Sequence, residues 1–495
     1  MSVHLLAQVL AALLCYEIVR FFVVRAVRRS AERRVSRYRV DRRIRIDRYK
    51  LANRSYVRAE ILDDPTVQAA ILEAAKEKGS VEDVRRTVEA YVEEIVPAFN
   101  FVSYYQLARR FARFATNLVY DVSADRASML RAASSLREHD VVVFVSNHRS
   151  NADYVTLARV LMRQTSISYA VGEWARVWPL DSIFRSFGAF FVRRGFPDPL
   201  YHAVLRRYVQ LSARRGVTQG IFPEGGLSRD GKLRPPKVGL LTSLALLLSD
   251  PDFRGDVVLV PVGVNYDRVL EDTSLLAERD GGSPPSARDR LSSLARLIVR
   301  GPVVVVDNGV RLLTGRLRRH GVAAVGFGAP VSLRALLAAV ARERADEPWA
   351  RSLGPTVMRA IGGVVPVTPV TITCLALAQA DGPITRDTLR GRVRALADRL
   401  HEAGAPFARV PRLRALRRVR ATLEHERAER DRRREMLEME EEMLGWDEAE
   451  GLMDLALEML ARRRIVRVTG EVVEVAAARR DLVAYYANSL AHYAG

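Results

Sequence analysis

The sequence predicts an α/β protein in which a mostly parallel sheet is covered by helices and flanked by helical regions at both ends. Helical stretches separate six apolar runs that are rich in β-branched residues: 140–146, 166–171, 188–194, 217–224, 257–266 and 302–309. Strands that alternate with helices form right-handed crossovers, which make the strands parallel and cover both faces of the sheet. Ligands of such sheets bind beyond the carboxyl ends of the strands, so polar motifs there are the first candidates for function.

Composition and charge are those of a globular protein with an excess of basic residues. The chain has 495 residues, of which 48% are hydrophobic and 27% charged, and this composition excludes a disordered chain. The two cysteines, Cys15 and Cys374, lie far apart, so we expect no disulfide framework and no thiolate metal cluster. The formal net charge of +20 favours anionic partners such as phosphate esters and acidic lipid. No nucleic-acid partner is expected, because RNP-like and zinc-finger patterns are missing.

The first 25 residues are predicted to attach the chain to a membrane. Residues 1–16 carry no charged side chain, and the apolar run continues to Val24 although Glu17 and Arg20 interrupt it. A helix needs about 20 mostly apolar residues to span a bilayer, and this run reaches that length only with both charges included. The arginine-rich stretch that follows favours anionic lipid at the cytoplasmic face of the cell membrane. The alternative is an amphipathic helix packed on the rest of the protein.

These patterns divide the chain into four regions: a membrane-association segment (1–25), an N-terminal helical region (26–125), an α/β domain (126–345) and a C-terminal mainly helical region (346–495). In the N-terminal region, apolar residues three and four positions apart predict helices at 61–79, 80–96 and 101–120.

Two stretches of the C-terminal region have unusual composition. Residues 364–378 are apolar, but Pro366 and Pro369 break them as a spanning helix, so we interpret them as a buried connector. Residues 412–434 are dominated by charge and are predicted to form a solvated helix.

The first candidate for chemistry is the segment SNHRSNADY (146–154), directly after the strand 140–146. His148 and Asp153 are five residues apart, which on a continuous helix separates them by about 140° around the axis. Their contact requires His148 in the turn after the strand and Asp153 in the first helical turn. A carboxylate on one imidazole nitrogen would leave the other free to take a proton from a hydroxyl. Such a pair also occurs in purely structural roles, so it does not decide the function alone.

Two further strand ends carry polar residues. Arg193 and Arg194 close the run GAFFVRR (188–194), and paired guanidinium groups suit a phosphate, although solvated surface charge explains them equally well. The stretch 220–237 ends a strand with an acidic residue, glycines, a hydroxyl and several cations, and glycines let a backbone approach an anion. This stretch also reads G-x-x-x-x-G-K, but Leu233 follows where a P-loop has serine or threonine. The stretch therefore argues against a P-loop NTPase.

Four motifs occur in a fixed order: NHRSNAD (147–153), GAFFVRR (188–194), FPEGGLSR (222–229) and LVPVGVNY (259–266). Together they resemble the glycerolipid acyltransferases, and in detail the bacterial membrane-associated glycerol-3-phosphate acyltransferase family, which is related to dihydroxyacetone-phosphate acyltransferase. The flanking stretches 94–101, 367–378 and 482–492 extend the resemblance. One departure is Leu227, because the family usually has arginine at that position.

The resemblance implies the glycerolipid acyltransferase type of fold and the transfer of an acyl group to the sn-1 hydroxyl of glycerol-3-phosphate. The donor would be acyl-CoA or acyl-carrier protein, and the product lysophosphatidate opens phospholipid biosynthesis. His148 would be the general base and Asp153 its orienting partner. The other implied site residues bind the acceptor: Arg149, Arg193, Arg194 and Arg229 its phosphate, and Glu224, Gly225 and Ser228 its glycerol hydroxyls. No metal and no redox cofactor is implied.

Two alternatives are also compatible with these motifs. An enzyme of the same fold could use lysophosphatidate or another lysolipid as acceptor. A catalytically silent membrane scaffold could also retain the fold, although the intact His148 and Asp153 argue against it.

Overall fold

The computed structural model describes four stretches of the chain, 54–97, 109–279, 319–411 and 443–493, with short gaps that include residue 194, 344–348 and 445–448. Three predicted features lie outside the described residues: the membrane-association segment 1–25, the strand 302–309 and the helix 412–434. Within the described stretches, no helix has both the length and the hydropathy needed to cross a membrane.

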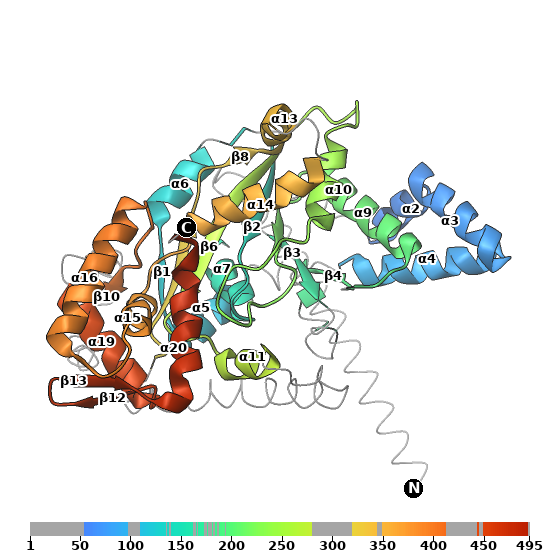
Figure 1. Cartoon of the computed structure of the whole chain (residues 1–495). Coiled ribbons are helices and arrows are strands. Elements are labelled where there is room, and N and C mark those ends of the chain that lie inside the picture. Colours follow the sequence, from blue (N-terminus) through green and yellow to red (C-terminus); the bar gives the residue numbers. More distant parts are fainter. Residues whose placement is uncertain are drawn as a thin grey trace, which may run out of the picture.

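An eight-stranded sheet with the order β1-β7-β6-β2-β5-β3-β4 forms the centre of the protein, and β8 also pairs with β6 (Figure 1). The strands are β1 (Asp121–Ala124), β2 (Val141–Ser146), β3 (Ser168–Gly172), β4 (Phe190–Val192), β5 (Gln219–Ile221), β6 (Val257–Tyr266), β7 (Val322–Phe327) and β8 (Val331–Ser332). Strands β6, β2, β5, β3 and β4 pair in parallel, as do β1 and β7, whereas β7 and β8 are antiparallel to β6. The prediction of a mostly parallel sheet is confirmed.

The predicted apolar runs coincide with the strands from β2 to β6. Three further strands, β1, β7 and β8, are not among the predicted runs. Two of them have four residues or fewer, and β7 has the sequence VAAVGF, in which alanines and a glycine replace the branched residues that mark a strand.

Strand β6 is fully buried and changes partner along its length. Its first half pairs with β8 through Val258 and Leu259, and its second half pairs with β7 from Val262 onward. Pro261 has no N–H to donate, and it lies where one partner ends and the other begins. On its other side, β6 pairs with β2 over six residues, so these two strands form the middle of the sheet.

Helices cover both faces of the sheet, and α2 and α3 lie farther out beside α9. The helices are α2 (Arg54–Leu62), α3 (Pro65–Lys78), α4 (Val81–Ile95), α5 (Arg109–Val119), α6 (Arg126–Ser134), α7 (Asp153–Leu161), α9 (Pro199–Arg214), α10 (Gly239–Leu247), α11 (Asp272–Arg279), α13 (Leu333–Glu343) and α14 (Trp349–Gly362). Alternate residues of β2 face opposite ways. Val141, Val143 and Val145 join a hydrophobic cluster with residues of α4, α9, α10 and α14, whereas Val142 joins a second cluster that includes residues of α7.

The N-terminal helices α2, α3 and α4 form a unit that packs beside α9 (Figure 1). The structure divides the predicted helix 61–79, because Pro65 cannot continue α2 and instead starts α3. The Asp64 side chain caps α3 by accepting the Thr66 N–H at 3.0 Å. Gly79, with φ of 77°, ends α3, and Ser80 caps α4, which is the predicted helix 80–96.

The C-terminal region is mainly helical, as predicted, and its described helices are α15 (Pro369–Ala378), α16 (Arg386–Glu402), α19 (Ala449–Arg462), α20 (Arg480–Ala487) and the 3₁₀ helix η6 (Asn488–Tyr493). It also contains a small sheet of β12 (Val466–Thr469), β13 (Val472–Val475) and β9 (Ile384–Thr385), and the pair β10 (Val410–Pro411) and β11 (Met443–Leu444). The predicted connector 364–378 is buried, but most of it is a helix, because Pro369 occupies the first turn, where proline is tolerated. Side chains of α15, α19 and α20 share one hydrophobic cluster with the sheet.

Candidate active site

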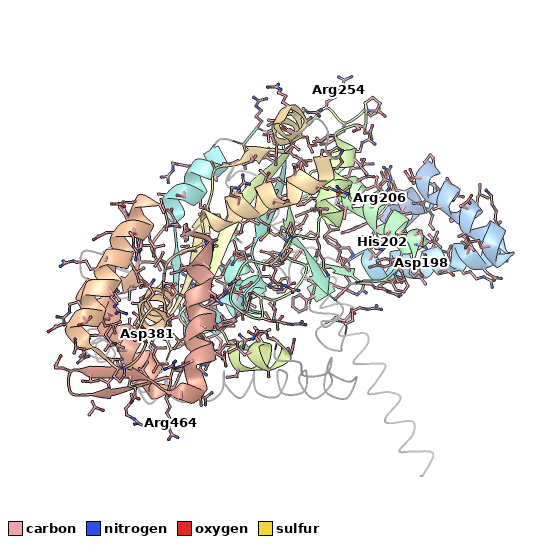
Figure 2. The ribbon with its side chains drawn as sticks, in the orientation of Figure 1. Asp198, His202, Arg206, Arg254, Asp381 and Arg464 are labelled. Atoms are coloured by element: carbon pink, nitrogen blue, oxygen red, sulfur yellow. The ribbon has the colours of Figure 1, made fainter. Side chains whose placement is uncertain are left out.

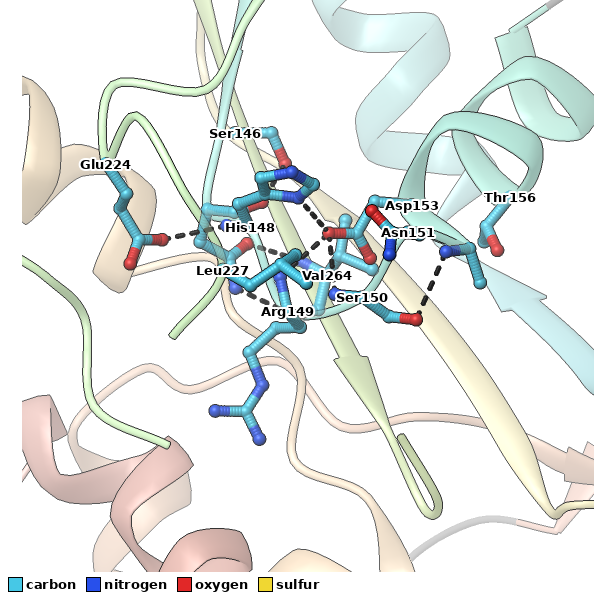
Figure 3. Close-up of polar contacts among 12 residues, drawn as sticks. Ser146, His148, Arg149, Ser150, Asn151, Asp153, Thr156, Glu224, Leu227 and Val264 are labelled. Carbon is cyan, nitrogen blue, oxygen red and sulfur yellow. Dashed lines mark hydrogen bonds and ion pairs between the residues drawn. The ribbon is translucent and has the colours of Figure 1, made fainter. Parts of the chain in front are cut away.

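The His148 and Asp153 side chains meet as the sequence predicts. Strand β2 ends at Ser146, His148 lies in the following loop, and Asp153 is the first residue of α7. The His148 Nδ1 lies 2.8 Å from the Asp153 Oδ2, and both side chains are almost completely buried (Figure 3). A carboxylate on Nδ1 selects the tautomer in which Nε2 carries the lone pair. The geometry therefore suits a general base.

Asp153 is held by more than the histidine. Its Oδ2 also accepts the backbone N–H of Arg149 at 2.7 Å and that of Ser150 at 3.1 Å. Its Oδ1 accepts the hydroxyl of Tyr266, at the end of β6, at 2.7 Å. Burial holds the pKa of Tyr266 well above its ordinary value, so the hydroxyl stays a donor. These bonds fix the carboxylate. Tyr266 is the last residue of the fourth motif, LVPVGVNY, but the motif alone does not predict its contact with Asp153.

The loop between β5 and α10 encloses the His148 backbone. The Glu224 Oε1 accepts the His148 N–H at 2.8 Å, and the His148 carbonyl accepts the Ser228 N–H at 3.0 Å. The imidazole stacks on Phe222 with ring centroids 4.2 Å apart and meets the edge of Tyr154. The first and third motifs therefore meet at His148, and the fourth reaches its partner Asp153 through Tyr266.

A cavity of about 370 Å³ opens beside His148. It lies at the carboxyl ends of β3, β4 and β5, the expected place for a ligand of a parallel sheet. Its lining combines apolar side chains, among them Val171, Leu205, Ile221, Phe222 and Leu240, with the basic side chains Arg193, Arg206 and Lys237 and the imidazole of His202. The arrangement can hold a ligand with an anionic end near a proton-accepting imidazole.

Glu224 and Ser228, implied to hold glycerol hydroxyls, are engaged with the protein. The two Glu224 oxygens accept the backbone N–H groups of His148 and Arg234, at 2.8 and 2.9 Å. The Ser228 hydroxyl donates to the Lys232 carbonyl at 2.7 Å and accepts the Gly231 N–H at 3.1 Å. Both side chains are almost fully buried, so the structure places them as supports of the loop.

Burial raises the pKa of Glu224 to about 7, although the backbone N–H groups of His148 and Arg234 lower it. Because this pKa lies above the unfolded value of about 4.3, the folded protein binds the proton more tightly. This tighter binding stabilises the folded protein fully below the unfolded pKa, and the stabilisation is lost as the pH rises to about 7. Between pH 5 and pH 8, we expect the free energy of unfolding of the wild type to fall by up to ~3 kcal/mol relative to that of Glu224→Gln. Thermal unfolding of both proteins measures this difference. A pH-independent difference between the two proteins would contradict this pKa.

The predicted arginines do not lie together. Arg193 lines the cavity, but its guanidinium forms a two-point ion pair with Glu94 of α4, with contacts of 2.8 and 2.5 Å. Arg149 is buried and points away from the imidazole (Figure 3) toward the ring of Tyr485 in α20. Arg229 is half exposed and pairs with Glu278 at 3.2 Å. Neither Arg149 nor Arg229 lines the cavity, and Arg194 lies outside the described residues.

The Leu227 side chain packs against the hydrophobic cluster that contains α7. Its carbonyl accepts a hydrogen bond from the Arg234 guanidinium at 3.1 Å, so a cation lies beside the position where the family usually has arginine.

Helix α20 and the following 3₁₀ helix support the loops around His148, a role that the sequence did not predict. The Arg149 guanidinium donates to the Gly231 carbonyl and lies 4.9 Å from the ring centre of Tyr485. The Asn488 amide donates to the Asp230 carbonyl at 2.8 Å. The Arg149–Tyr485 and Asn488–Asp230 contacts join residues more than 250 positions apart, and no local pattern predicts them.

Two family models match the chain, and they name the class of protein that this fold and this site define. Residues 130–265, which contain β2, His148 and Asp153, match the model described as Acyltransferase. Residues 310–445 match the model described as Glycerol-3-phosphate acyltransferase C-terminal region. The two matches cover more than half of the chain. The chain belongs to the glycerol-3-phosphate acyltransferase family.

Individual relatives agree with this assignment. The chain is 31% identical over 382 residues to a glycerol-3-phosphate acyltransferase of Aeromonas hydrophila, covering 73% of this chain and 44% of that protein. It is 30% identical over 356 residues to one from Shewanella frigidimarina, covering 67% and 41%. The chain thus spans less than half the length of these relatives. A solved 1-acyl-sn-glycerophosphate acyltransferase from Thermotoga maritima is 16% identical with a TM-score of 0.30, over 52% of this chain and 78% of that one.

Proposed function

We propose that the protein transfers an acyl group from acyl-CoA or acyl-carrier protein to the sn-1 hydroxyl of glycerol-3-phosphate and so forms lysophosphatidate. The observation that carries the proposal is the buried His148–Asp153 pair at a cavity lined by apolar and basic side chains. The names of the curated relatives support glycerol-3-phosphate as the acceptor.

The chemistry follows from the geometry of the pair. The His148 Nε2 takes the proton of the acceptor hydroxyl, and the oxygen attacks the thioester carbonyl carbon. The new C–O bond forms, the C–S bond breaks, and the thiolate leaves with the proton from the imidazolium. Asp153 keeps Nδ1 hydrogen-bonded throughout and stabilises the imidazolium charge. The acyl group passes directly between substrates, so the reaction needs neither a covalent acyl-enzyme nor a metal or redox cofactor.

Labelled glycerol-3-phosphate, supplied with acyl-CoA or with acyl-carrier protein, tests the proposal. We expect labelled lysophosphatidate with at least one donor. Lysophosphatidate and other lysolipids, offered as competing acceptors, serve as the control. Acylation of a lysolipid without any acylation of glycerol-3-phosphate would contradict the proposed acceptor, and no transfer to any acceptor would favour a silent scaffold.

The same proposal places the protein at the cytoplasmic face of the cell membrane, held by residues 1–25 and by the arginine-rich stretch after them. We expect a variant lacking residues 1–25 to sediment with vesicles that contain anionic lipid at low salt and to be released at high salt. The full chain should stay bound at high salt. If the truncated variant does not bind anionic vesicles at low salt, the basic stretch does not contribute to membrane binding.

A further inference from the structure

The cavity beside His148 is lined by three basic side chains, Arg193, Arg206 and Lys237, and by the imidazole of His202, and none of the described lining residues is acidic. Three of the four come from the same end of the sheet, since Arg193 follows β4 and the other two, His202 and Arg206, lie one turn apart on α9 (Figure 2). Positive charge that lines a cavity attracts an anion.

Two of these four side chains already have partners. The Arg193 guanidinium is paired with Glu94 and lies near three aromatic rings, with centroid distances of 4.6 to 5.5 Å. The His202 Nε2 lies 2.7 Å from the carbonyl oxygen of Phe196. Both side chains are therefore held in place by the protein, and the Arg193 charge is already paired with Glu94.

Arg206 and Lys237 are different, because their side chains have no hydrogen bond or ion pair within the described part of the chain. The other arginines near the C-terminal half of α9 are paired: Arg207 with Asp64 at 2.6 Å, Arg214 with Asp250 at 3.1 Å and Arg215 with Glu60 at 2.8 Å. Arg206 thus stands apart from its neighbours by facing the cavity without a carboxylate.

Lys237 is built into the loop that holds His148. Its backbone N–H donates to the Pro223 carbonyl at 2.7 Å. Its side chain crosses Gly225, where an added Cβ would lie 2.7 Å from the lysine Cδ. Gly225, with φ of 63°, therefore leaves room for the lysine stem, and the preceding Glu224 holds the His148 N–H. This arrangement places a cation close to the base.

We propose that Lys237 and Arg206 bind the phosphoryl group of a substrate at this cavity. The proposal rests on the proposed function, in which both substrates carry such a group: the phosphate ester of the acceptor and the phosphopantetheine phosphate of the donor. A guanidinium offers a two-point fork and an ammonium a compact charge, and phosphate accepts both. The short path from Lys237 through Gly225 and Glu224 to His148 favours the acceptor, whose phosphate lies close to its reacting hydroxyl.

Steady-state kinetics of Lys237→Met and Arg206→Met test the site, with acceptor and donor varied separately. Methionine keeps the apolar stem and removes the charge. We expect each variant to raise one KM at least about tenfold, with kcat within about threefold of wild type. Lys237→Arg should restore most of the affinity. A raised acceptor KM assigns the group to glycerol-3-phosphate, and a raised donor KM assigns it to phosphopantetheine.

Arg229→Met is the matched control, because Arg229 is the cation that the family resemblance assigns to phosphate and it lies outside the cavity. Its KM values should stay close to those of wild type. An unchanged KM for both substrates in the Lys237 and Arg206 variants, or a rise confined to Arg229→Met, would overturn the proposal.

Thermal shifts with glycerol-3-phosphate and with inorganic phosphate, measured without donor, separate this site from the proposed reaction. We expect both ligands to stabilise wild type and to lose most of that effect in Lys237→Met. If the protein shows no acyl transfer but the ligands still stabilise it through Lys237, the proposed function is contradicted and the phosphate site is supported. If both variants transfer acyl groups normally, keep the wild-type KM values and are still stabilised by the ligands, the phosphate site is contradicted and the proposed function is not.

Discussion

Replacement of His148 by alanine is expected to lower acyl transfer about a thousandfold while the protein stays folded. General bases contribute about 10²- to 10⁴-fold to a rate, and no other described side chain combines contact with the cavity and an orienting carboxylate in this way. Initial rates with saturating glycerol-3-phosphate and thioester measure the loss. Near-normal turnover by the folded variant would contradict the mechanism.

The surroundings of His148 explain why the fold should survive. Asp153 keeps its bonds to the Arg149 and Ser150 N–H groups and to Tyr266 when the imidazole is removed.

Asp153→Ala should be less severe for activity, because the imidazole keeps its place on Phe222 and loses only its orientation. Tyr266→Phe removes one bond to the carboxylate and should shift the pH profile of kcat while lowering kcat by no more than about tenfold.

The part of the site that the sequence could predict is the part encoded locally. The five-residue spacing of His148 and Asp153 has one consistent geometry after a strand, and the structure has that geometry. The long apolar run of β6 likewise identifies a central strand. Burial on both faces leaves such a strand few alternatives.

The contacts that decide the rest are distant in sequence. Tyr266 reaches Asp153 from 113 positions away, and the Asn488 amide reaches Asp230 from 258 positions away. The resemblance pointed to Arg229, but whether a cation faces the cavity depends on where the loop after β5 turns. That turn brings Lys237 over Gly225 and leaves Arg229 beside Glu278. Local sequence patterns therefore do not predict which cation of this loop faces the cavity.

Gly231→Ala is expected to be the most damaging single methyl addition among the described glycines near the active site. Gly231 has φ of 91°, and an added Cβ would lie 1.9 Å from the carbonyl oxygen of Tyr485 in α20. The loop or the helix must then move apart. That movement disturbs the Asn488–Asp230 bond and the Ser228 contact with the His148 carbonyl. We expect a lower Tm and a loss of activity of at least about tenfold.

Gly404→Ala is the control that separates the cost of backbone strain at positive φ from the cost of the steric clash with α20. Gly404 has φ of 76°, but an added Cβ there would meet nothing within 4 Å. Both variants carry the cost of a left-handed alanine, about 1–2 kcal/mol, and only Gly231→Ala adds the steric cost of about 1–3 kcal/mol against α20. Thermal unfolding of the two variants should therefore differ, and only Gly231→Ala should lose activity. Equal Tm losses with normal turnover in both would mean that the loop around His148 does not depend on its contact with the C-terminal helix.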